Sequence, residues 1–145
     1  MLNQDFRKFI QSLNDNHARY LVVGGYAVAF HGHPRYTKDI DIWIEMSAEN
    51  ASNVVAALEQ FGFGSLGLRE DDFLTPDQVI QLGHPPSRID LLCTVSGVSF
   101  GDCYESRVTV EIDGVPINFT EITQQEVSSL SAVDVQEWAD EITLA

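Results

Sequence analysis

Residues 39–44, with the sequence DIDIWI, constrain the fold most because acidic and apolar side chains alternate along them. A period of two is typical of a β-strand, and it places Asp39 and Asp41 on one face, about 7 Å apart along the chain. The isoleucines between them then point to the opposite face, toward a core. Aspartate is unfavourable in strands, and two carboxylates on one face resist joint ionisation. This strand therefore requires either exposure to solvent or a cation shared by the two acids.

A third acid, Asp90, lies in a second apolar segment, residues 88–92 with the sequence RIDLL. Ile89 and Leu91 would face one way and Asp90 the other. An acid in an apolar strand is costly unless it is paired or bound to a metal. Two explanations remain open for Asp90: an ion pair with Arg88 or a loop cap, or a metal site shared with the acids of residues 39–44. Magnesium fits the second, because it favours carboxylates together with substrate phosphate oxygens.

A glycine pair, Gly24 and Gly25, follows the apolar residues 20–23 and precedes the helical pattern that starts at Tyr26. Glycines between a strand and a helix allow a phosphate to approach the backbone, where the helix N-terminus offers free N–H groups. A glycine pair alone is more often a tight turn. His31 and His33 lack the acid or cysteine that would complete a zinc site, so we do not expect zinc or a zinc hydrolase.

The remaining pattern mixes helices, strands and hairpins. Asp113-Gly114 between two alternating segments is typical of a β-hairpin, and Ser47 is a predicted helix N-cap. We predict one α/β (α+β) domain over residues 1–145, with helices packed on a mixed sheet. Helices are expected within 3–17, 26–30, 48–61 and 100–104 and twice after residue 123, a loop at 62–67, a surface segment at 68–76, and strands at 20–23, 39–44, 79–82, 88–93, 108–112 and 115–119.

The net charge of −14 argues against a broad nucleic-acid-binding face, because such a face relies on Lys and Arg. Eight acidic residues and no Lys or Arg follow Arg107. Arg35 and Lys38 are a local exception just before Asp39. The two cysteines have no metal-binding spacing, and no apolar stretch resembles a signal peptide or a membrane span. We therefore expect an acidic, soluble, cytoplasmic protein with no membrane partner.

These motifs resemble the DNA polymerase β-like nucleotidyltransferase superfamily, whose signature is an apolar residue, a Gly-Gly or Gly-Ser pair, an acidic-apolar-acidic strand and a later third acid. Val23-Gly24-Gly25, Asp39-Ile40-Asp41 and Asp90 match it. The resemblance covers roughly residues 20–122 and is closest to small bacterial minimal nucleotidyltransferases, including relatives of toxin–antitoxin nucleotidyltransferases.

The resemblance implies a nucleotidyltransferase fold and an enzyme. It would move a nucleoside monophosphate from a nucleoside triphosphate to a hydroxyl of a protein, a tRNA or a small molecule, with Mg²⁺ or Mn²⁺ as cofactor. The implied catalytic and metal-binding residues are Asp39, Asp41 and Asp90. The implied nucleotide-binding residues are Gly24, Gly25 and Tyr26, joined by Arg35, Thr37 and Lys38 through their position next to the acids.

The C-terminal segment departs from this group. Relatives usually carry a segment rich in Lys and Arg there, whereas residues 124–145 contain neither. A polyphosphate would lack the cationic partner that such residues supply. The alternative is therefore a catalytically weak or inactive protein with this fold that acts as a partner-binding module, such as the antitoxin of a toxin–antitoxin pair.

Overall fold

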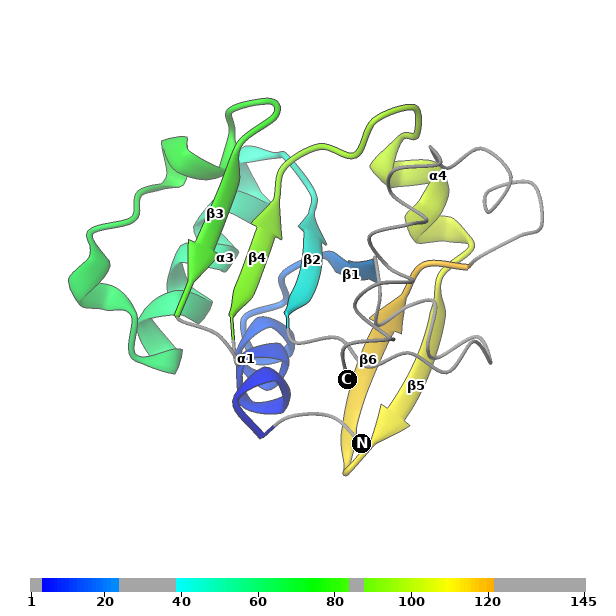
Figure 1. Ribbon diagram of the computed structural model, residues 1–145, viewed down its shortest axis with the longest axis horizontal. Coiled ribbons are helices and arrows are strands. Elements are labelled where there is room, and N and C mark those ends of the chain that lie inside the picture. Colours follow the sequence, from blue (N-terminus) through cyan, green and yellow to red (C-terminus); the bar gives the residue numbers. More distant parts are fainter. Residues whose placement is uncertain (1–3, 24–38, 84–87, 122–145) are drawn as a thin grey trace.

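The computed structural model describes residues 4–23, 39–83 and 88–121, and they form a mixed six-stranded sheet with helices on it (Figure 1). The strand order is β3-β4-β2-β1-β6-β5. Strand β2 runs parallel to β4, and β1 runs parallel to β6, while the other three neighbouring pairs are antiparallel. The predicted mixed sheet is confirmed. The strands are β1 (Tyr20–Val23), β2 (Ile40–Ile44), β3 (Val79–Leu82), β4 (Ile89–Leu92), β5 (Val108–Ile112) and β6 (Val115–Phe119).

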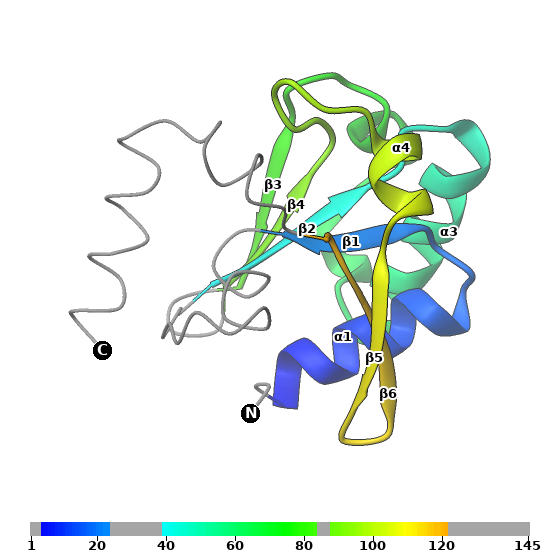
Figure 2. The same cartoon turned by 90° about the vertical axis from the view of Figure 1, so that its right-hand side faces the viewer.

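Helices α1 (Gln4–Asp15) and α3 (Ala48–Phe61) cover one face of the sheet, as Figure 2 shows. The side chains that α1 and α3 bury belong to one hydrophobic core with alternate residues of the central strands. Ile40, Ile42 and Ile44 of β2 are fully buried in this core, as the alternation predicts. The odd-numbered residues of β2 consequently point to the opposite face of the sheet.

Local sequence signals account for several boundaries. The Ser47 side chain accepts a hydrogen bond from the Asn50 N–H and caps α3 as predicted. Asp113 and Gly114 both have positive φ and connect β5 to β6, which confirms the predicted hairpin. Helix α4 (Phe100–Glu105) occupies the predicted helical turn.

Two expectations for residues 62–76 differ from the structure. The predicted loop contains a 3₁₀ helix, Gly64–Leu66, and the predicted surface segment contains another, Glu70–Phe73. Phe73 is fully buried, because this segment packs against α3 and lets one aromatic side chain reach the core. The helix predicted at 26–30 and the two helices predicted after residue 123 lie outside the described residues.

Asn50 of α3 holds the start of β1 and the end of β2 together. Its side chain is buried, accepts a hydrogen bond from the Arg19 N–H at 2.6 Å, and donates to the carbonyl oxygens of Arg19 at 3.1 Å and Glu45 at 2.8 Å. These bonds satisfy backbone groups just beyond the strand ends. Asn50 therefore connects the helix layer to the two central strands.

We expect Asn50→Ala to lower the free energy of unfolding by about 2 kcal/mol, because the Arg19 N–H and the Glu45 carbonyl oxygen lose the partner that the buried Asn50 side chain supplies, while the Arg19 carbonyl oxygen keeps its bond from the Glu45 N–H. Asn53→Ala is the matched control on the same helix. The Asn53 side chain is half-buried and makes one long hydrogen bond of 3.4 Å, so its loss should cost about 0.5 kcal/mol or less. Urea denaturation measures both values, and equal losses would contradict this role of Asn50.

Candidate functional site: an acidic array with one arginine

The three predicted acids lie on the same face of two neighbouring strands. In the parallel pairing of β2 with β4, Asp41 lies beside Asp90 and Ile40 beside Ile89. Neighbouring strands are about 4.8 Å apart, and register partners point to the same side. Asp39 lies two residues before Asp41 and shares that side. The sheet therefore brings Asp39, Asp41 and Asp90 together on the face opposite α1 and α3.

Arg88 completes this array. The Arg88 carbonyl oxygen accepts a hydrogen bond from the Ile40 N–H at 3.1 Å, which places residue 88 beside the start of β2. The guanidinium group binds both strands: Nη2 lies 2.8 Å from Oδ2 of Asp39, and Nε lies 3.0 Å from Oδ1 of Asp90. Nη2 also donates to Oδ2 of Asp90 at 3.2 Å. The ion pair between Arg88 and Asp90 is one of the two explanations that the sequence analysis offered for an acid within this apolar strand.

The acids of the array shift the pKa of Arg88. The hydrogen bonding of the Arg88 guanidinium to the Asp90 carboxylate is the largest cause that raises the pKa of Arg88 above its usual range; burial opposes it, and the charges of Asp90, Asp39 and Asp41 add to it. Arg88 is therefore permanently charged. Among the described residues, Arg88 brings one positive charge to the array and forms ion pairs with two of its three carboxylates.

The donor set suits magnesium or manganese, because carboxylate oxygens are the ligands that these hard cations prefer. The side chains of Asp39 and Asp90 are 22% and 10% exposed, and Oδ1 of Asp39 is buried from solvent. Within residues 4–23, 39–83 and 88–121, however, no three His, Cys, Asp or Glu side chains are gathered closely enough to hold a metal ion. Arg88 occupies carboxylate oxygens that a metal at this array would need.

Gly24, Gly25, Tyr26, Arg35, Thr37 and Lys38, predicted to bind nucleotide, lie outside the described residues, as do His31 and His33. Strand β1 leads toward them: Val23, the last residue of β1, pairs with Asp41. The C-terminal end of β1 thus lies directly beside the acidic array. Val23, which directly precedes Gly24 in the sequence, is therefore the register partner of Asp41.

Comparison with known proteins supports the architecture. No protein-family model matches the chain, and no curated protein matches it either. Among solved structures, the fold is similar to that of a putative nucleotidyltransferase, TM1012, from Thermotoga maritima, with a TM-score of 0.58 and 16% sequence identity. The similarity covers 96% of this chain and 87% of that protein. The chain has a nucleotidyltransferase fold.

Beside the acids of this nucleotidyltransferase fold, the same face of β2 becomes aromatic. Trp43 is 2% exposed and packs edge-to-face against Phe100 of α4, with ring centroids 5.1 Å apart. Its indole N–H donates to the Cys93 carbonyl oxygen at 3.4 Å. Sequence reasoning did not assign this contact, because only the fold brings α4 to β2. Trp43 and Phe100 form an apolar surface next to Asp41 on this face of β2. Such a surface excludes water, so it weakens the solvent screening of the Asp41 charge on that side.

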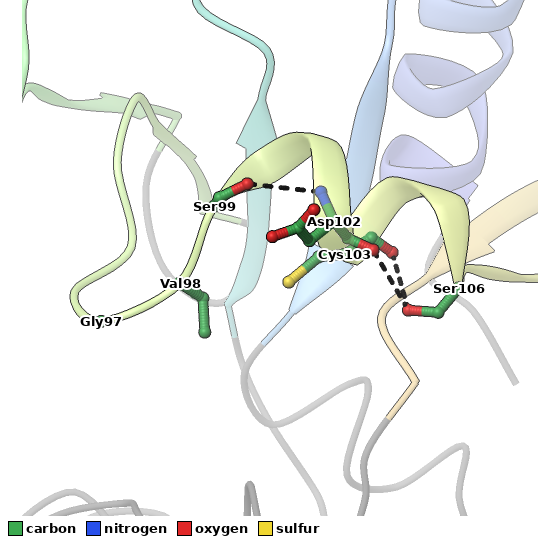
Figure 3. Close-up of a pocket in the computed structure, with 6 residues that line it drawn as sticks. All are labelled: Gly97, Val98, Ser99, Asp102, Cys103 and Ser106. Carbon is green, nitrogen blue, oxygen red and sulfur yellow. Dashed lines mark hydrogen bonds between the residues drawn. The ribbon is translucent and has the colours of Figure 1, made fainter.

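A hollow of about 730 Å³ lies along α4, away from the acidic array, and is shown in Figure 3. The Ser99 hydroxyl accepts from the Asp102 N–H, and the Ser106 hydroxyl donates to the carbonyl oxygens of Asp102 and Cys103. These hydroxyl groups cap α4, so they indicate a structural role. The hollow along α4 is lined by Gly97, Val98, Ser99, Asp102, Cys103 and Ser106.

Among the described residues, no helix has the length and apolarity required to cross a bilayer.

We expect Arg88→Gln to lower the free energy of unfolding in metal-free buffer by about 1–2 kcal/mol, because it removes a charged hydrogen-bond donor shared by two carboxylates. The matched control is Arg19→Gln. The Arg19 side chain is 58% exposed and makes two surface contacts, an ion pair with Glu45 at 3.4 Å and a cation–π contact 5.4 Å from the centre of the Tyr104 ring, so its loss should cost only about 0.5 kcal/mol. Denaturant titrations of both variants measure the difference, and an Arg88 variant as stable as wild type would contradict it.

Proposed function

We propose that the protein is a magnesium-dependent nucleotidyltransferase that moves a nucleoside monophosphate from a nucleoside triphosphate to a hydroxyl group. The observation that carries this proposal is the register of β2 and β4, which aligns Asp41 with Asp90 on the face that also bears Asp39. The nucleotidyltransferase fold supports it. The acceptor is a hydroxyl of a protein, a tRNA or a small molecule.

Each acid has a proposed role. Asp39 and Asp41 would hold the metal ions on the triphosphate, and Asp90 would complete the metal site and accept the proton of the acceptor hydroxyl. Bound Mg²⁺ supplies stabilisation of the charge on the attacking and leaving oxygens. The acceptor oxygen forms a bond to the α-phosphorus, and the bond from that phosphorus to pyrophosphate breaks.

The segment before Asp39 would bind the phosphates. Glycines 24 and 25 and the start of the next helix are proposed to offer backbone N–H groups to the triphosphate. Arg35, Thr37 and Lys38 precede Asp39 in the sequence and would add polar and charged contacts. Arg35 and Lys38 would supply the positive charge among them.

A second candidate function is a partner-binding module with this fold, such as an antitoxin. The observation that favours it is the ion pairing of Arg88 with Asp39 and Asp90, which compensates two of the three acids without any metal. The absence of Lys and Arg after Arg107 also favours it. In this case the acids would stabilise the sheet and contact a partner rather than bind metal.

Isothermal titration calorimetry with Mg²⁺ or Mn²⁺ and each nucleoside triphosphate distinguishes the two. We expect metal-dependent nucleotide binding that Asp41→Asn weakens by about tenfold or more, because a metal-binding carboxylate is lost. Asp113→Asn is the matched control, since it removes an exposed acid from the β5–β6 turn and asparagine favours the same positive φ.

Binding that Asp41→Asn leaves unchanged, or no binding of any triphosphate, would favour the partner-binding module. If binding is lost as expected, labelling a cell lysate with the preferred radioactive triphosphate identifies the acceptor class.

A further inference from the structure

The guanidinium group of Arg88 contacts the carboxylate oxygens that a divalent cation would require. It is bound to Oδ2 of Asp39 and to both carboxylate oxygens of Asp90. These two acids come from different strands, and Arg88 joins them across the parallel pairing of β2 with β4. A separate ion pair, between Arg19 and Glu45, involves none of the three acids.

We propose that Arg88 is a built-in competitor of the divalent cation: the guanidinium and the metal use the same oxygens, so the metal binds only when Arg88 leaves them. This inference rests on the proposed function, since it concerns the metal site of that reaction. It assigns Arg88 a positioning role: it holds the carboxylates of Asp39 and Asp90 in place before metal arrives and sets the affinity for the metal.

The geometry makes this exchange feasible. Arg88 is 29% exposed, more than either carboxylate it binds, and it precedes the first residue of β4. Its long side chain can rotate away without disturbing the sheet, whereas Asp90 is held within β4. Since two cations within a few ångströms repel strongly, simultaneous binding of both on these oxygens is unfavourable. The released guanidinium would be available to the phosphates of the nucleotide.

Competition has a thermodynamic consequence. The apparent affinity for a metal is reduced by the fraction of protein in which Arg88 covers the carboxylates. A phosphate that captures the guanidinium raises the affinity for the metal, and by linkage the metal raises the affinity for the phosphate. Metal and triphosphate would therefore bind together more tightly than either binds alone.

The test is a titration of full-length protein with Mn²⁺ alone, with free Mn²⁺ measured by electron paramagnetic resonance. We expect Arg88→Gln to bind Mn²⁺ about tenfold more tightly than wild type, because the competing charge is removed. Arg88→Lys should lie between the two, since an ammonium lacks the fork that binds two carboxylates. Arg19→Gln is the control and should match wild type. Thermal unfolding gives an independent readout, with a larger Mn²⁺-induced stabilisation of Arg88→Gln than of wild type.

The outcomes separate the two proposals. Equal or weaker Mn²⁺ binding by Arg88→Gln, with clear binding by wild type, overturns the role of Arg88 and leaves the proposed function intact. No Mn²⁺ binding by any variant, in the absence or presence of a nucleoside triphosphate, overturns both. If Arg88→Gln does not fold, Arg88→Lys decides, and binding no tighter than wild type overturns the competition.

Discussion

The parallel pairing of β2 with β4 is the constraint on which the rest of the structure depends. It places Ile40, Ile42 and Leu91 in the core under α1 and α3 and turns the charged residues of both strands to the other face. A register shift of one residue in either strand would move its aspartates into that core. The cost of burying unpaired carboxylates therefore fixes the same register that the apolar side chains favour. Packing and charge specify one arrangement together.

Much of this fold was predictable because its signals are local. The period-two alternation of residues 39–44 predicts both the strand and the face of each acid, and the structure confirms the buried isoleucines. The turn at Asp113 and Gly114 and the cap at Ser47 each depend on a few adjacent residues, so sequence alone identifies them. The mixed sheet follows from short hairpins combined with longer connections that contain helices.

The interactions that join distant segments were not predictable in this way. The ion pair of Arg88 with Asp90 was an open alternative, since residues two apart in a strand share a face. The contact of Arg88 with Asp39 requires β4 to pair with β2, and no local sequence pattern predicts that pairing. The burial of Phe73 was not predictable for the same reason. Phe73 lies in a polar segment, and it reaches the core only because that segment packs against α3.

Arg88 also reconciles folding with the proposed chemistry. Three carboxylates that are proposed to bind a metal would repel one another in its absence, and this repulsion would act on β2 and β4. A cation within the chain removes much of that cost during folding, without requiring metal or nucleotide. The difference in exposure matters here: Asp90 is 10% exposed and remains fixed in β4, while Arg88 is 29% exposed at its edge. Arg88, rather than the aspartates, is thus the side chain placed to move. In the proposed exchange, the aspartates stay in position while a metal ion replaces the guanidinium group.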